Sequence, residues 1–400
     1  MATTRYSGYR SYSYLREGED YAPFELAAEI GRVPPYAQPL TEDERARVRS
    51  LLESSIVISL HDHPVVFPRR MEETIAYNRT ARQRTGFEGL SRSWMTCVVD
   101  NLMDGTGCIT SQYGWKWDDA VLDIGMRLCD IAHQDYVVHA TGVRDILDCK
   151  SSGRLAWVLG MEAATPIENE VDRIDVLYGL GVRQMGIAYS EANALGSGLR
   201  ERRDGGLTVF GRRCVERMNR LGMAIDVSHS GDVTSRDVVE ASEKPVLITH
   251  AGSRTVWNSP RMKPDDVIVA CAQRGGVIGV EAAPHTTISR THPRHSIDSV
   301  MDHVLHCIDL VGIDHVAFGP DTLFGDHVGL HDLFAAQLSV RDIQGAEGFE
   351  RVAYVDGLEN PGECFENIVG WLVRHGFSDD DIRKLIGDNV LRVLGEIWVA

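Results

Sequence analysis

The stretch of sequence that decides the fold is LGMAIDVSHSGDVTSRDVVEASEKPVLITHAG, residues 221–252. Two short apolar runs, at 222–229 and 245–250, flank a segment with helical periodicity at 232–243. A strand, a helix and a second strand in this order are typical of a βα unit, in which the two strands are parallel. The runs end in His229 and His250, so we expect both imidazoles at the same, carboxyl-terminal edge of a sheet.

The same alternation continues through most of the chain. We predict eight strands, at 56–63, 93–100, 154–162, 182–189, 222–229, 245–250, 276–282 and 315–321. Helical patterns lie between most of them, at 118–134, 166–179, 208–221, 232–243, 264–274 and 296–311. The strands are near-continuous apolar runs, as in sheets that are covered on both faces. Eight such units predict an α/β fold of the (β/α)8 TIM-barrel type, with its active site at the C-terminal rim of the strands.

A doubly wound open sheet is the main alternative fold. Such sheets commonly carry a glycine-rich phosphate-binding loop directly after a strand. The glycine-rich stretch GSGLRERRDGG (196–206) follows no clear strand end with that spacing, so we exclude a dinucleotide site there.

The ends of the chain differ in character from its middle. Residues 1–40 are polar and rich in Tyr, Ser and Pro, and we predict an N-terminal arm that wraps the body or a neighbouring subunit. Residues 41–400 are predicted to form a single domain that begins with a helix, because Thr41 and Glu44 have the spacing of a capping box. Two helices are expected within 361–397, and the second should begin at Ser378. The segment 79–118 and the loop 322–357 are long enough to cover a pocket.

Composition excludes several classes of protein. The formal net charge of −17 argues against nucleic acid as a partner. No apolar run is long enough to span a membrane, and the N-terminus lacks the apolar core of a secretory signal. The eight cysteines include no C-x-x-C pair and read as reduced core residues. We therefore expect a cytoplasmic protein that acts on a small molecule.

Candidate metal ligands stand at the ends of the predicted strands. His61 and His63 alternate on one strand, which places both side chains on one face, about 7 Å apart. Asp62 between them would face the helices instead. Glu162 ends the run RLAWVLGME, and Gly160 beside it permits close approach. Metal ligation best explains such a carboxylate, and a salt bridge with an arginine is the alternative.

His229 and His250 complete a set of five, and each of these histidines alone could be a core residue. Together, five imidazole and carboxylate ligands suit two zinc-like ions bridged by a carboxylate, although manganese, iron or cobalt would also fit. Asp321 ends the last strand in FGPD. It is either a proton carrier or a loop cap.

At this point the chain resembles the membrane (renal) dipeptidase family of the amidohydrolase superfamily. The resemblance runs from about Ile56 to Leu394. It is carried by GLTVFGRRCVERMNRLGMAIDVSHSGD (206–232), PVLITHAGSR (245–254), GLGVRQMGIAYSEAN (179–193), GGVIGV (275–280) and GDNVLRVL (387–394).

The resemblance implies a barrel with two zinc ions and a homodimer. His61 and the residue two after it would bind one ion, Glu162 would bridge both, and His229 and His250 would bind the second. Arg261, in NSPRMKPDD, falls where the family binds the substrate's terminal carboxylate, and Asp321 falls at the catalytic aspartate.

Two positions depart from the family's pattern. His63 stands where the family usually has an aspartate, which makes that metal site more positive by one charge. Such a site should bind metal more weakly but make its bound water more acidic. Tyr189 stands where the family has a histidine that contacts the scissile carbonyl or its oxyanion. A phenol can still donate a hydrogen bond to an oxyanion.

These residues predict a zinc-dependent hydrolase that cleaves the amide bond of a dipeptide or small N-acyl amino acid through a metal-bridging hydroxide. Three alternatives stay open. The first is a divergent amidohydrolase that acts on a non-peptide amide, ester or lactone. The second is a metal-dependent lyase or decarboxylase on the same barrel. The third is a non-catalytic protein with a relic site, which the complete set of ligands disfavours.

Overall fold

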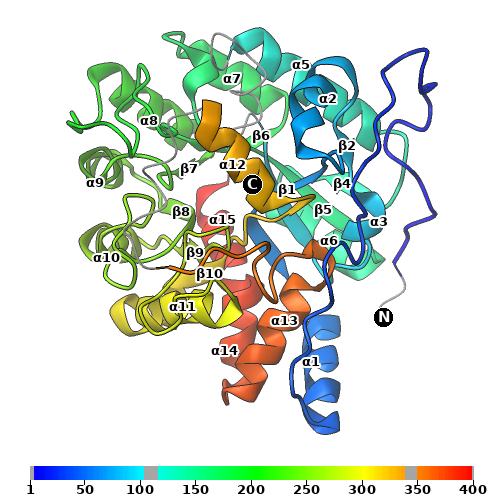
Figure 1. Cartoon of the computed structure of the whole chain (residues 1–400). Helices are drawn as coiled ribbons and strands as arrows, with labels where there is room; N and C mark the ends of the chain where they lie inside the picture. Colours follow the sequence, from blue (N-terminus) through cyan, green and yellow to red (C-terminus); the bar gives the residue numbers. More distant parts are fainter. Residues whose placement is uncertain (1–3, 103–115, 338–348, 399–400) are drawn as a thin grey trace.

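The computed structural model describes residues 4–102, 116–337 and 349–398. At its centre a parallel sheet curls round on itself, and helices cover its outer face (Figure 1). Among the described residues eight strands lie side by side in chain order: β1 (Ile58–Val66), β3 (Cys97–Leu102), β5 (Leu155–Met161), β6 (Val182–Gly186), β7 (Ala224–Asp226), β8 (Val246–Ala251), β9 (Ile278–Val280) and β10 (Val316–Phe318). Each overlaps a predicted strand. The order never reverses, so the doubly wound alternative is wrong.

Helices occupy most of the connections between these strands, as the periodicity predicted. They are α5 (Trp117–Ile131), α6 (Val143–Ser152), α7 (Asp172–Gly179), α8 (Val209–Leu221), α9 (Asp232–Ala241), α10 (Asp265–Gln273) and α11 (Ile297–Val311). Of these, only α6 was not predicted. Two short strands, β2 (Arg84–Thr85) and β4 (Val137–His139), were also missed and extend the sheet beside β1 and β5. The structure therefore confirms an α/β fold built from parallel βα units.

The two ends of the sheet lie next to each other. The amide nitrogen of Asp321, just after β10, donates to the carbonyl of His61 at 3.0 Å, and that of His63 donates to the carbonyl of Thr322 at 2.9 Å. The short strand β11 (Leu323–Phe324) then pairs in parallel with β1. The last strand connection thus delivers Asp321 directly to the histidines of the first strand.

The interior of the sheet has two parts. Where the strands begin, small apolar side chains fill it, and we call these residues the apolar half: Ile58, Leu60, Cys97, Val99, Ala156, Val158, Ala224, Leu247, Val277 and Ala317. They pack against the C-terminal helix α15 (Asn389–Ile397). Where the strands end, buried polar side chains replace them, and we call these the polar half: His61, Asn101, Gln184, Asp226, Thr249 and Glu281. The apolar half closes the interior at one end, so a ligand must enter from the polar half.

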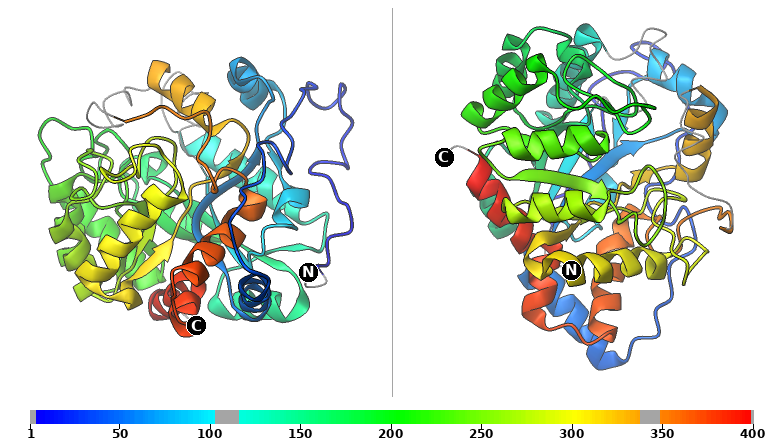
Figure 2. Two further views of the ribbon diagram at one scale, coloured as in Figure 1. Left: turned by 60° about the horizontal axis from the view of Figure 1, so that its bottom comes forward. Right: turned by 90° about the vertical axis from the view of Figure 1, so that its left-hand side faces the viewer.

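The segment 322–357 was predicted as a loop, and this expectation is wrong for its first part. It contains α12 (His327–Gln337). Asp326 begins this helix by accepting a hydrogen bond from the amide nitrogen of Gly329 at 2.9 Å, a capping contact that favours helix. Figure 2 shows α12 on the side of the molecule toward which the strand arrowheads point. It therefore lies over the polar half. Residues 103–115, within the other predicted pocket-covering segment, lie outside the described residues.

The N-terminal segment lies along the body of the molecule. Tyr9 and Ser11 donate side-chain hydrogen bonds to the buried carboxylate of Asp130 on α5, and the amide nitrogen of Tyr12 does so at 2.7 Å. The predicted helix after Thr41 is present as α1 (Glu42–Ser54), with its capping box. The division into an arm and one domain stays a prediction.

The C-terminal region contains α13 (Pro361–Arg374), α14 (Asp379–Arg383) and α15, joined by a π-helical turn at Lys384–Asp388. The second predicted helix is therefore interrupted. A Cβ atom at Gly387 would lie 2.0 Å from the carbonyl oxygen of Ile56, so the turn brings two backbones closer than any other residue permits. Ser378 caps α14 as predicted, because its hydroxyl accepts from the amide nitrogen of Asp381.

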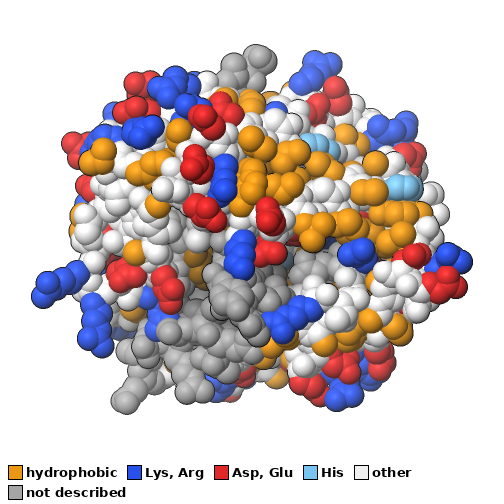
Figure 3. All heavy atoms as spheres, turned by 90° about the horizontal axis from the view of Figure 1, so that it is seen from above, with side chains coloured by type: hydrophobic (Ala, Val, Ile, Leu, Met, Phe, Trp, Pro, Cys, Tyr) orange, Lys and Arg blue, Asp and Glu red, His pale blue; other side chains and the backbone are white. Residues whose placement is uncertain are grey.

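The surface and the cysteines complete the description. On the face shown in Figure 3, acidic and basic side chains are interspersed among apolar patches. No helix within the described residues is long and apolar enough to cross a membrane. Of the seven cysteines described, all are free and six are buried. Cys129, expected in the core, is exposed instead.

Candidate metal centre

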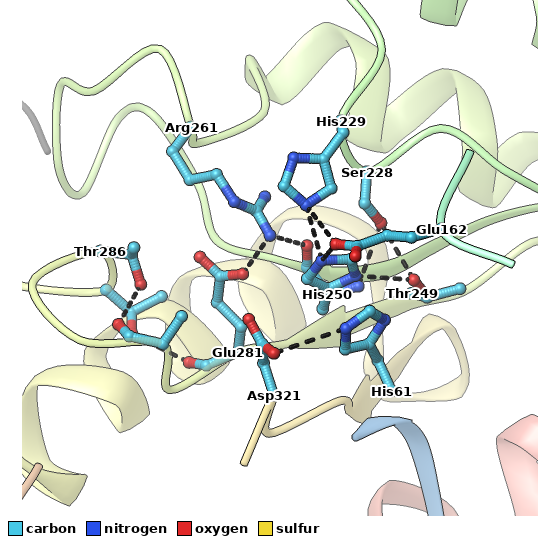
Figure 4. Close-up of polar contacts among 12 residues, drawn as sticks. His61, Glu162, Ser228, His229, Thr249, His250, Arg261, Glu281, Thr286 and Asp321 are labelled. Atoms are coloured by element: carbon cyan, nitrogen blue, oxygen red, sulfur yellow. Dashed lines mark hydrogen bonds and ion pairs between the residues drawn. The ribbon is translucent and has the colours of Figure 1, made fainter. Parts of the chain in front are cut away.

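Glu162, His229 and His250 meet at the carboxyl ends of β5, β7 and β8. The Oε1 atom of Glu162 lies 2.9 Å from Nε2 of His229 and 3.3 Å from Nε2 of His250, and the two Nε2 atoms are 2.9 Å apart (Figure 4). All three residues are buried. Three donor atoms converging from three strands on one point form a candidate metal site.

His61, His63 and Asp321 form a second group beside the first. Oδ1 of Asp321 lies 3.5 Å from Nε2 of His61 and 3.2 Å from Nε2 of His63, and these two nitrogens are 3.2 Å apart. Asp321 has a φ of +58°, which is uncommon for a residue other than glycine. Such strained backbone positions cluster at functional sites.

The two groups lie close enough together to form one cluster. Ligand atoms within 4.8 Å of one another occur in three sets: His61 with His63 and Glu162; His61 with His250 and Asp321; and Glu162 with His229 and His250. The ring of His61 stacks on that of His250, with centroids 3.4 Å apart. Glu162 thus lies within reach of both histidine pairs. The donor set of imidazole nitrogens and carboxylate oxygens fits zinc or a similar divalent cation.

Burial sets the protonation state of the ligands. It holds the pKa values of His229 and His250 well below their usual range and also lowers the pKa of His61. Burial opposes ionisation of Asp321, but hydrogen bonds with His61 and His63 outweigh it and hold the pKa of Asp321 well below its usual value. Neutral imidazoles and ionised carboxylates are the forms that bind metal.

A layer of polar residues fixes the orientation of the imidazoles. Asn101 contacts Nδ1 of His61 at 2.8 Å, and Gln184 donates to Asn101 at 3.2 Å. The Thr249 hydroxyl contacts Nδ1 of His250 at 2.9 Å and donates to Asp226 at 2.9 Å. Outer partners of this kind set which imidazole nitrogen faces a metal.

Gly160 matters here for a reason the sequence only partly revealed. A Cβ atom at this position would lie 2.6 Å from Oδ1 of Asn101, so the glycine makes room for the residue that orients His61. The predicted close approach at Gly160 is therefore confirmed, with Asn101 as the group that approaches.

Asp62 faces away from the ligands, as predicted. Its Oδ1 accepts hydrogen bonds from the amide nitrogen of Thr322 at 2.6 Å and from the Thr322 hydroxyl at 2.8 Å. Burial raises the pKa of Asp62 to about 6. Thr322 follows Asp321 in the chain, so Asp62 anchors the backbone that carries Asp321.

Tyr189 and Arg261 both border the cluster. The ring of Tyr189 stacks on that of His229, with centroids 4.1 Å apart and planes inclined by 21°. Arg261 is buried, and its Nη2 donates to the carbonyl oxygen of His250 at 2.9 Å and contacts the carboxylate of Glu281. The structure therefore gathers all eight residues that the sequence singled out.

Several residues near the cluster were missed. Glu281 directly follows β9, so the rule that selected Glu162, a carboxylate at the end of an apolar run, would have found it. His327 and His331 are carried over the polar half by α12, and burial lowers the pKa of both, to about 4 for His331. Their helix was predicted as a loop, so no signal placed them at the site.

Comparison with known proteins identifies the family. The model of the membrane dipeptidase family, peptidase family M19, matches residues 111–343, more than half of the chain. The chain belongs to this family. The resemblance predicted from the sequence is thereby confirmed, although the segment with His61 and His63 precedes the matched residues.

Individual relatives are distant. Dipeptidase tcpJ of Claviceps purpurea is 26% identical over 278 residues, which are 69% of this chain and 59% of that protein. Dipeptidase verJ of Clonostachys rogersoniana is 29% identical over 281 residues, 68% of this chain and 64% of that protein. The chain thus spans about six tenths of the length of these relatives. The crystal structure of an amidohydrolase from Pseudomonas aeruginosa matches with a TM-score of 0.72 and 25% identity, covering 88% of this chain and 99% of that one.

Proposed function

We propose that the protein is a metal-dependent hydrolase that cleaves the amide bond of a dipeptide or a small N-acyl amino acid. The observation that carries the proposal is the position of Glu162, whose carboxylate lies among the donor atoms of His61, His63, His229 and His250. Membership of the membrane dipeptidase family supports it. In this proposal the curled sheet is a (β/α)8 barrel, closed where β1 meets the segment after β10.

The five ligands would hold two divalent cations, with Glu162 bridging them. Such ions polarise a substrate carbonyl and lower the pKa of bound water, which makes water a nucleophile at neutral pH. Zinc suits the ligand set. We propose both the identity of the ions and their number, two per chain.

The chain's own residues would carry the remaining roles. Asp321, ionised and held by His61 and His63, would accept the proton of the attacking water and deliver it to the leaving amine. Tyr189 would donate its phenolic hydrogen to the oxygen that becomes negatively charged. Arg261 would contact the leaving portion of the substrate, because it borders the cluster beside His250.

Two experiments test the proposal. Zinc-loaded protein should hydrolyse members of a mixed L-L and L-D dipeptide library, read by mass spectrometry, with about two metal ions per chain by elemental analysis. Cleavage of another amide or ester but of no dipeptide would contradict the dipeptide assignment. A protein without stoichiometric metal would contradict the whole proposal.

Replacing Asp321→Asn tests the proton carrier. We expect a loss of about 10²–10⁴-fold in kcat with the metal content unchanged, because the variant keeps the shape of the side chain. Unchanged turnover would remove Asp321 from the mechanism, and loss of metal would make it a ligand instead.

A further inference from the structure

Arg261 and Glu281 contact each other through only one polar atom of each side chain. Nη2 of Arg261 contacts Oε2 of Glu281 and donates to the carbonyl oxygen of His250 at 2.9 Å (Figure 4). The other two atoms, Nη1 of Arg261 and Oε1 of Glu281, are buried and have no hydrogen-bond partner among the described residues. One ion pair thus carries an open donor and an open acceptor. Buried atoms of this kind are rare in folded proteins and need an explanation.

The surroundings of Glu281 leave its Oε1 atom without a donor. Arg261 is 4% exposed and Glu281 is 0% exposed, so bulk water does not solvate the open atoms. The Thr286 hydroxyl acts on the Glu281 carboxylate but donates its hydrogen to the carbonyl of Ala283 at 2.5 Å. Burial raises the pKa of Glu281 to about 7, even though the charge of Arg261 lowers it. The carboxylate is therefore short of donors, and a ligand with an N–H group would supply one.

The pair lies where the leaving portion of the proposed substrate would be. Figure 4 shows the Glu281 carboxylate between the guanidinium of Arg261 and the carboxylate of Asp321, whose charge acts on Glu281. In the proposed reaction Asp321 delivers a proton to the leaving nitrogen, and Arg261 contacts the leaving portion. The nitrogen and the carboxylate of an α-amino acid are attached to the same carbon atom. A substrate that places its carboxylate on Arg261 therefore brings its nitrogen toward Glu281 and Asp321.

We propose that Arg261 and Glu281 together recognise the leaving α-amino acid, with its carboxylate on Nη1 of Arg261 and its N–H group on Oε1 of Glu281. The inference rests on the proposed function for the identity of the reaction and defines the substrate class more closely. The substrates are dipeptides and N-acyl amino acids whose scissile nitrogen carries a hydrogen. Glu281 is then a specificity-determining residue. It disfavours leaving residues with a fully substituted nitrogen, such as proline, because its buried acceptor would stay unpaired.

The test compares two ligands that differ only in the nitrogen. L-alanine carries a carboxylate and an ammonium group, whereas propionate carries the carboxylate alone. Their dissociation constants would be measured by NMR titration of the zinc-loaded protein at about pH 8, where Glu281 is ionised. We expect wild type to bind L-alanine more tightly than propionate by about 10-fold or more. In Glu281→Gln this preference should fall below about 3-fold, while propionate should bind no more weakly than to wild type.

Two further variants separate the roles of the pair. Arg261→Gln should weaken the binding of L-alanine and propionate alike, because both place a carboxylate on Nη1, and the preference for L-alanine should persist. The double variant Arg261→Gln with Glu281→Gln leaves no buried charge unpaired, so it replaces Glu281→Gln if that variant does not fold. Its preference should also fall below about 3-fold. Equal binding of the two ligands to wild type, or an unchanged preference without Glu281, would overturn the proposal.

Hydrolysis assays distinguish this inference from the proposed function. If the proposed function holds, wild type should cleave L-alanyl-glycine with a kcat/KM about 10-fold or more above that for L-alanyl-sarcosine, whose scissile nitrogen is methylated. Glu281→Gln should narrow this ratio. Equal values for the two dipeptides in wild type would contradict the inference alone. Failure to cleave any dipeptide would contradict the proposed function, while the binding data still decide whether Glu281 recognises the nitrogen.

Discussion

Leu247 and Thr249 lie two residues apart on β8 and both are 0% exposed, yet they belong to different halves of the sheet interior. The side chain of Leu247 belongs to the apolar cluster that fills the apolar half. Thr249 hydrogen-bonds to Asp226 and His250. Two equally buried side chains on one strand therefore make different kinds of interaction. The apolar half stabilises the folded state because its hydrocarbon is removed from water. Each buried polar group of the polar half must instead form a hydrogen bond or an ion pair.

The largest effect on stability should come from the apolar half. Leu247→Ala removes buried hydrocarbon and leaves a cavity, so we expect the free energy of unfolding to fall by about 2–5 kcal/mol. Urea unfolding with the metal removed would measure it. The folded protein should bind metal as wild type does, and a weakened metal affinity would show that the two halves are coupled.

Thr249→Val on the same strand is the matched change in the polar half. It keeps the shape of the side chain but leaves the Asp226 carboxylate and Nδ1 of His250 each short of one hydrogen bond. We expect metal affinity to fall by about 10–100-fold, measured by competition with a chelator. The loss of unfolding free energy should be about 1–3 kcal/mol. Unchanged metal affinity would show that the polar half does not orient the metal ligands.

The smallest effect per group concerns pH, and its clearest case is His303, a buried histidine of α11 outside both halves. His303 lies between the amide nitrogen of Ser253 and the carbonyl of Ile288, and burial lowers its pKa to about 4. Between its usual pKa of about 6.5 and this value, the unfolded chain binds a proton that the folded chain does not, so stability falls as the pH falls.

At pH 5.5 this difference amounts to about 1.4 kcal/mol for His303. The pKa values of His61, His229 and His250 are shifted in the same direction. The apolar half has no group that titrates in this range. Unfolding free energies of the metal-free protein at pH 7.5 and pH 5.5 would measure the effect, and equal values would contradict it.

Sequence reasoning recovered the parts of the molecule that depend on local pattern. The eight strands were visible because strands buried on both faces are short, continuous apolar runs. Glu162, His229 and His250 were visible because each ends such a run. The positions of the ligands follow from one rule, namely that parallel strands end at one edge.

What sequence reasoning missed depends on contacts between distant residues. The ion pair between Arg261 and Glu281 joins two βα units, and the sequence around either residue does not indicate its partner. The hydrogen bond between Asn101 and His61 is likewise formed across two strands. The helix α12 was read as a loop because its polar beginning concealed the cap at Asp326.

The adjacency of β1 and the segment after β10 has a consequence for the making of the protein. His61 and Asp321 come from opposite ends of the sheet, so their contact joins residues that the ribosome releases far apart in time. Long-range pairings of this kind form slowly. Until the last strand has been synthesised and paired, the imidazoles of the first strand face an open interior. Binding of metal by the complete cluster would therefore require that both ends of the sheet have been synthesised and have come together.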